Sequence, residues 1–191
     1  MSLQKINIRT IVLISMMLLA SLMRLISYEF PYTLSLFTPL AAIGLFGGAY
    51  FTDKWKAYLV VAITLFLSDI FINYLYTSKL IFWYDGALWV YLPFLMMVFI
   101  GSFIKKVTFG SVAIAALISV AVHWLISDLP WLYGTRYPHN FAGYVQSLTA
   151  AIPFEKNLLM ANVVFCTILF GGFELAKSKY SILRDKKELA V

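Results

Sequence analysis

Apolar residues in this chain gather in long runs that short polar breaks separate. Crossing the hydrocarbon core of a bilayer takes about 20 mostly apolar residues, and six runs reach or approach that length. They cover residues 10–28, 36–51, 55–76, 87–104, 108–127 and 157–176. The second run is short and has Pro39 near its start, where the first helical turn tolerates proline. The pattern predicts an all-α membrane protein with six transmembrane helices in a single domain over residues 1–191.

Composition supports an apolar surrounding for these runs. Of the 191 residues, 62% are hydrophobic and only 13% are charged, whereas soluble domains carry roughly 45–50% and about 25%. The first run follows Lys5 and Arg9 as a signal peptide would. It is longer than a typical signal core, contains Arg24 and lacks a clear cleavage site, so we expect a retained helix.

The distribution of Lys and Arg predicts the orientation. Cytoplasmic loops of membrane proteins are enriched in these residues. One side of the six-span arrangement holds eleven of them: Lys5, Arg9, Lys54, Lys56, Lys105, Lys106, Lys177, Lys179, Arg184, Lys186 and Lys187. The other side holds only Lys79, Arg136 and Lys156. We therefore expect both termini, including the tail 177–191, in the cytoplasm of a bacterial cell, with the chain in the inner membrane.

The longest break, residues 128–156, is then expected outside. It contains Trp131, Tyr133, Tyr137 and Tyr144, and such rings favour the level of the lipid headgroups. Residues 141–152 are apolar at helical spacing but too few to cross the membrane. Two interpretations stay open for this part: a re-entrant or interfacial helix over the outer mouth, or an ordinary structured loop.

Polar side chains inside the predicted spans are the candidates for function, because a charge at the centre of a span costs about 2.5–3.5 kcal/mol on insertion scales. Arg24, Asp69 and His123 each lie about 21 or 22 Å from the inner end of their spans. The candidate substrate-binding residues are Arg24, Asp69, Asn73, His123, Asp128 and Asn162. Their shared depth predicts a polar pocket in the outer half of the membrane.

Small residues mark the inner half instead. Gly44, Gly47 and Gly48 in the second run let helix backbones approach closely, so we expect them in helix packing. The polar residues also have structural alternatives. Arg24 and Asp69 fit a buried ion pair, while Asn73 and Asn162 fit hydrogen bonds between helices. His123 fits a satisfied interior histidine, and Cys166 a small buried apolar side chain.

Several function classes lack their signatures. Zinc-protease, serine-hydrolase and phosphate-loop motifs do not occur, and the charge is not arranged as a nucleic-acid-binding stripe. Two histidines and one cysteine do not predict a metal site. We expect no enzyme, no cofactor and no nucleic-acid partner. An intramembrane enzyme with His123 and Asp69 as acid and base is a third hypothesis, which requires a substrate within hydrogen-bond reach of both.

Two stretches carry a family resemblance. The segment FTPLAAIGLFGGAYF at residues 37–51, the LSD at residues 67–69 and the stretch from YGTRYPHNF to CTILFGG at residues 133–172 resemble a family of uncharacterised bacterial membrane proteins. More distantly, the six-run chain resembles the substrate-capture subunits of energy-coupling-factor vitamin transporters. That resemblance implies separate energising subunits as partners. Those subunits favour two alanines four residues apart in the first helix, where the partner docks. This chain departs from that pattern, because its first helix has only Ala20 beside Ser21.

The leading hypothesis is a component for uptake of a small solute or micronutrient, with the lipid bilayer as its surroundings. Arg24 would meet an anionic group or hold Asp69, and Asp69, Asn73 and His123 would contact polar atoms of the solute. Trp83, Trp89, Trp124 and Trp131 are candidates for stacking on a ring. The alternative is a structural or assembly protein that transports nothing, in which the buried charges form an ion pair.

Overall fold

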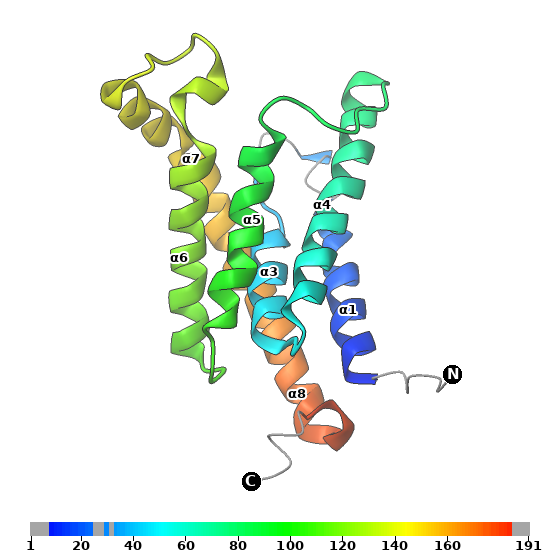
Figure 1. Ribbon diagram of the computed structural model, residues 1–191. Coiled ribbons are helices and arrows are strands. Elements are labelled where there is room, and N and C mark those ends of the chain that lie inside the picture. Colours follow the sequence, from blue (N-terminus) through cyan, green and yellow to red (C-terminus); the bar gives the residue numbers. More distant parts are fainter. Residues whose placement is uncertain (1–7, 25–28, 31–32, 185–191) are drawn as a thin grey trace.

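The computed structural model describes residues 8–24, 29–30 and 33–184, and its regular elements are helices. Their long axes lie side by side in a bundle (Figure 1). The α-helices are α1 Ile8–Ser21, α3 Leu40–Tyr50, α4 Lys54–Thr77, α5 Ala87–Ser102, α6 Phe109–Ser127, α7 Phe141–Cys166 and α8 Gly172–Lys179. Short helical turns occur at η1 Pro130–Tyr133, η2 Thr167–Gly171 and η3 Ser181–Leu183.

Three helical stretches are long and apolar enough to cross a membrane. They are Lys54–Thr77, Phe109–Ser127 and the continuous stretch Phe141–Lys179. Shorter apolar helices, α1, α3 and α5, accompany them. Large apolar side chains such as Leu59, Leu67 and Leu117 are exposed on the outer faces, where water would disfavour them. The chain is therefore all-α, and its long apolar helices indicate a multi-pass membrane protein.

Helix α3 lies at the centre of the bundle (Figure 1). It contacts α1, α4, α5, α6 and α7, and ten of its eleven residues are buried. A helix that is apolar all round belongs in a protein interior. At 1.5 Å per residue it is about 16 Å long, roughly half the thickness of a bilayer core. It starts four residues later than the predicted run 36–51, at Leu40.

Glycines set the approach of α3 to α5. A Cβ atom on Gly48 would overlap the carbonyl oxygen of Val98, and one on Gly101 would overlap the backbone of Leu45. A Cβ on Gly44 would lie 2.9 Å from the Cβ of Met97. These two helices therefore pack backbone to backbone, as close contacts between small residues permit. Gly47 faces other neighbours, Ala57 of α4 and Met17 of α1.

The predicted break before the last span does not exist. Residues 141–152 are the first turns of α7, which continues through Pro153 and Glu155 to Cys166. The ordinary-loop interpretation is therefore wrong, and the helix of the other interpretation is present but continuous with the last predicted span. Proline removes one backbone hydrogen bond but does not end a helix held by its neighbours. The connection shortens to residues 128–140, with η1 inside it.

Local signals explain the ends of several helices. Thr108 and Ser111 form a reciprocal capping box at the start of α6. The side chain of Asn140 accepts a hydrogen bond from the Gly143 N–H at the start of α7. Helix α4 ends at Thr77, and the residue that caps it, Ser78, has a φ of 55° in the left-handed region. The bounds of α4 and α6 agree with the predicted runs to within one residue at each end.

The remaining predicted bounds differ more. Helix α1 ends at Ser21 rather than near residue 28, and residues 25–28 lie outside the described part of the chain. Helix α5 ends two residues before the predicted run 87–104 does. In the predicted tail, α8 reaches Lys179 and η3 follows, while residues 185–191 lie outside the described part.

Replacing Gly48 with alanine tests the contact between α3 and α5. The added Cβ has to displace backbone, so we expect the Gly48→Ala protein to lose roughly 1–3 kcal/mol of stability. The readout is the temperature at which the detergent-solubilised protein loses its monodisperse elution profile. Gly110→Ala is the matched control, because nothing lies within 4 Å of the position of its Cβ. If the two variants melt at the same temperature, the close contact between α3 and α5 at Gly48 is contradicted.

Candidate functional site

A cavity of about 390 Å³ lies among α3, α4, α5, α6 and α7, at the end of α6 that holds Asp128. We call it the polar cavity. Its polar lining consists of Arg24, Thr38, His123, Ser127, Asp128, Tyr133 and Glu155, with Ser35 at its edge. Rings of Phe37, Tyr76, Phe94 and Phe154 supply much of the remaining wall. A few polar groups within mostly apolar walls are typical of small-molecule sites.

Arg24 ties the chain after α1 to α4. Its Nη2 donates to Asp69 Oδ1 at 2.5 Å, and its Nη1 donates to the Ser68 hydroxyl and to the carbonyl oxygen of Leu65. Asp69 also accepts a hydrogen bond from the Tyr84 hydroxyl at 3.2 Å. The carboxylate is buried, and the arginine side chain is only 15% exposed. This ion pair neutralises two charges that hydrocarbon would reject separately.

His123 of α6 and Glu155 of α7 form a second buried pair. The His123 Nδ1 lies 2.7 Å from Glu155 Oε1, and the ring also packs against Phe94 at a centroid distance of 5.2 Å. Both residues are more than nine-tenths buried. The other carboxylate oxygen, Glu155 Oε2, is buried and has no hydrogen-bond partner among the described residues. A buried carboxylate oxygen without a donor is costly, and Glu155 is one of the residues that line the polar cavity.

Asp128, directly after α6, also lines the polar cavity. Its Oδ1 accepts a hydrogen bond of 2.5 Å from the Tyr133 hydroxyl, and its carbonyl oxygen accepts one from the Ser147 hydroxyl. Burial raises the pKa of the Asp128 carboxyl above its ordinary value, and the Tyr133 hydrogen bond opposes part of that shift. Burial also raises the pKa of Tyr133, which therefore remains a hydrogen-bond donor at neutral pH.

A non-helical segment before α3 forms the base of the polar cavity. The side-chain amide of Asn157 donates to the carbonyl oxygens of Thr33 and Ser35, which fixes this segment to α7. Leu36 has a φ of 61°, a left-handed conformation that a branched side chain rarely adopts. Helix α3 then begins behind Pro39, which offers no side-chain cap. Such strained backbone persists only where its surroundings hold it, and it is common at ligand sites.

Three of the six predicted binding residues line the polar cavity: Arg24, His123 and Asp128. Asp69 lies behind Arg24 and reaches the cavity only through it. Asn73 is half-buried on α4 and does not line this cavity. His123 and Asp69 have different partners, Glu155 and Arg24 respectively.

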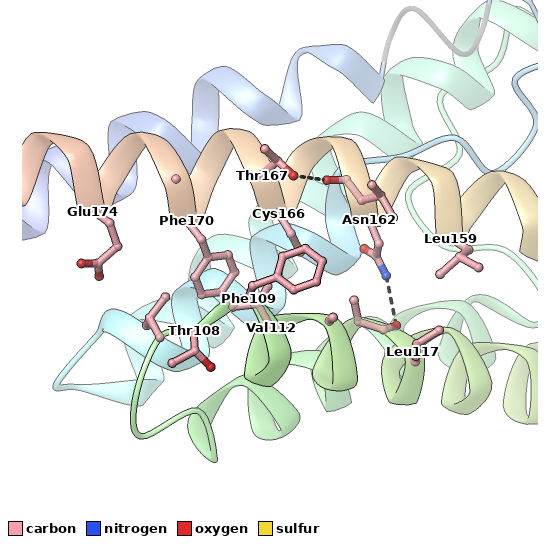
Figure 2. Close-up of a pocket in the computed structure, with 15 residues that line it drawn as sticks. Thr108, Phe109, Val112, Leu117, Leu159, Asn162, Cys166, Thr167, Phe170 and Glu174 are labelled. Atoms are coloured by element: carbon pink, nitrogen blue, oxygen red, sulfur yellow. Dashed lines mark hydrogen bonds between the residues drawn. The ribbon is translucent and has the colours of Figure 1, made fainter.

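Asn162 lies at a different place. It lines a groove between α6 and α7, where Figure 2 shows it pointing toward α6. Its amide nitrogen donates to Ser119 Oγ at 3.0 Å and approaches the carbonyl oxygen of Ala116. Cys166 is buried one turn further along α7. Both residues pack between helices, as the structural alternatives for them propose.

Glu155 was not among the predicted site residues, because it fell within the predicted outer connection. Within one continuous helix it belongs to a buried stripe at helical spacing: Gly143, Ser147, Ala151, Glu155, Leu158 and Asn162. The regular spacing of these buried residues on both sides of Pro153 was the feature of the sequence that indicated one continuous helix. The proposed tryptophans lie elsewhere: Trp83 packs against Tyr91, and the Trp124 indole donates to the carbonyl oxygen of Leu148. Among residues 8–24, 29–30 and 33–184, no three metal-ligating side chains of His, Cys, Asp or Glu gather.

Comparison with known proteins adds a family and no activity. Residues 4–185 match a family described as a family of unknown function, DUF6580. No curated protein matches the chain, and no solved structure matches it. The family match covers nearly the whole sequence, including α1 to α8 and both buried ion pairs. The chain therefore belongs to the DUF6580 family.

Proposed function

We propose that this protein captures a small polar solute in the polar cavity, as a component of an uptake system in the bacterial inner membrane. The single observation that carries the proposal is that Glu155, whose buried Oε2 has no partner in the described structure, is among the residues that line a 390 Å³ cavity. Small-molecule sites have volumes of roughly 300–1,000 Å³, so one compact solute fits. Arg24, His123 and Asp128 add polar groups of both charge signs.

The half-length helix α3 supports this proposal. Non-helical backbone at membrane depth is tolerated only where protein buries it or where it lines a cavity. The segment before α3 lines the polar cavity with Ser35, Leu36 and Thr38. Interrupted helices of this kind hold substrates in several membrane transporters, where the end of a half-helix faces the ligand. The Asn157 clamp keeps the interruption in place.

The proposal includes six membrane crossings with both termini in the cytoplasm. The excess of Lys and Arg near one end of the bundle supports that orientation. The polar cavity then faces the outside, as capture of an external solute requires. The described chain lacks a phosphate-loop motif, so we assign the energy for uptake to an ion gradient or to separate partner subunits.

A second candidate function is structural: an assembly protein in which buried charges fix the arrangement of helices. The Arg24 contacts favour it, because its guanidinium already bonds Asp69, Ser68 and Leu65. Under this alternative, the ion pair joins α1 to α4 and no solute is bound. The two candidate functions assign different roles to Glu155. A structural role needs only the carboxylate oxygen that contacts His123, whereas solute capture also uses the other oxygen.

Replacing Glu155 with glutamine tests solute capture. The amide keeps the size of the side chain but loses the charge, so we expect at least tenfold less solute to be retained. Mass spectrometry of small molecules released from the detergent-purified protein supplies the measurement. Asp85→Asn is the matched control, because Asp85 is an exposed carboxylate away from the cavity. Absence of any retained molecule in the unmodified protein, or equal retention by Glu155→Gln, contradicts the proposal.

Exchanging the charges of Arg24 and Asp69 separates the two candidate functions. Arg24→Ala and Asp69→Ala each leave a buried charge unpaired, and we expect both to abolish solute retention while the protein stays extractable. The exchange variant, Arg24→Asp with Asp69→Arg, restores the ion pair in reverse. Under solute capture it should regain thermal stability without regaining solute. If the exchange variant instead behaves like the unmodified protein in every measurement, Arg24 and Asp69 form a structural ion pair.

A further inference from the structure

A second hollow lies at the opposite end of α6, away from Asp128. It is a groove of about 580 Å³ between α6 and the stretch from α7 to α8, and we call it the apolar groove. Figure 2 shows Phe109, Val112 and Leu117 on the α6 side, facing Leu159, Cys166 and Phe170. From Phe109 to Leu117 the groove follows α6 for about 12 Å. Its walls are mostly carbon, which suits a hydrocarbon chain.

The π-helical turn η2 shapes one wall of the apolar groove. Thr167–Gly171 replaces the regular α-helical repeat between α7 and α8. The Thr167 hydroxyl bonds back to the carbonyl oxygen of Val163, so it does not demand a partner from the groove. Nothing lies within 4 Å of the position that a Cβ on Gly171 would take. Single π turns of this type recur at functional sites.

A basic cavity adjoins the apolar groove. It also measures about 580 Å³ and shares Val107 and Glu174 with the groove. Its charged lining comprises Arg9, Lys54, Lys105, Lys106 and Lys177, with Glu174 as the carboxylate. Glu174 already accepts from the Tyr50 hydroxyl at 2.5 Å and pairs with Lys177 at 2.9 Å. This cavity therefore has a strong excess of positive charge.

Lys105 and Lys106 are the cations available to a ligand. Both side chains are exposed, and within the described residues neither ammonium group has a hydrogen bond or an ion pair. Lys54 is also near, although its ammonium donates to the carbonyl oxygen of Gly48 at 2.6 Å. Charge of this density next to a membrane attracts anionic headgroups.

We propose that the apolar groove and the basic cavity together bind one anionic phospholipid. An acyl chain would lie along α6, and the phosphate would lie among Lys105, Lys106 and Lys54. The adjoining positions of an apolar and a cationic hollow match a molecule that is apolar at one end and anionic at the other. A free phosphate would leave the groove unused, and a zwitterionic lipid would gain little from the excess of cations. The site does not depend on solute capture in the polar cavity.

The test uses the full chain in detergent with added lipid. We expect phosphatidylglycerol to raise the melting temperature, while phosphatidylcholine at the same concentration has a much smaller effect. Inorganic phosphate, without an acyl chain, should leave it unchanged. The proposal is overturned if both lipids act equally. Equal stabilisation by inorganic phosphate also overturns it, because the ligand would then be an ion.

Paired variants locate the lipid. The double variant Lys105→Gln and Lys106→Gln should weaken phosphatidylglycerol binding about tenfold or more, as native mass spectrometry measures. Its control, Lys56→Gln with Lys179→Gln, removes the same charge from basic residues that do not line the cavity. Equal weakening in the control would mean general attraction to the basic surface and would reject the site.

A second pair of variants tests the position of the acyl chain. Ala113→Trp fills the apolar groove and should reduce binding of phosphatidylglycerol at least fivefold. Ile114→Trp is its control, because Ile114 is the next residue on α6, is 60% exposed and does not line the groove. Melting curves in phosphatidylcholine check that both variants are folded. Unchanged binding by a folded Ala113→Trp protein would refute placement of the acyl chain in the groove.

Discussion

Hydrocarbon offers no hydrogen-bond partner to a polar group, and this constraint governs where the charges of the chain lie. Arg24, in the chain after α1, and Asp69 of α4 neutralise each other, and the His123 ring of α6 lies against the Glu155 carboxyl of α7. The two partners of each pair come from separate elements and lie 45 and 32 residues apart in the chain. The backbone obeys the same constraint, because Asn157 donates to two carbonyl oxygens of the non-helical segment before α3, and that segment lines the polar cavity. The polar cavity lies between the two pairs.

The sequence predicted the long helices best. Helices α4 and α6 have apolar runs with clear polar ends, so Lys54–Thr77 and Phe109–Ser127 agree with the prediction closely. Helix α3 is shorter than its apolar run, because Pro39 disfavours a helical conformation at the residue before it and the helix begins directly behind it. Helix α7 was predicted worst. Proline and two charged neighbours usually mark a boundary, but here tertiary contacts of Glu155 keep the helix continuous.

The candidate site could be predicted only in part. Depth along each span identifies Arg24, His123 and Asp128, which line one cavity. Depth does not specify the direction in which a side chain points around its helix, so Asn73 and Asn162 were grouped with them although neither lines that cavity. Glu155 was missed because its assignment depended on a wrong helix boundary. Pairing partners such as Tyr84 for Asp69 and Tyr133 for Asp128 follow from three-dimensional packing that apolar periodicity does not encode.

The continuous stretch from Phe141 to Lys179 has a mechanical consequence. At 1.5 Å per residue its 39 residues extend about 58 Å, well beyond a bilayer core of about 30 Å. Glu155 at one level and Glu174 at the other therefore belong to a single rod, interrupted only by the π turn. A tilt of that rod changes the width of the hollows near both leaflets together. Because this stretch lines both the polar cavity and the apolar groove, its tilt is a geometric variable that the two hollows share.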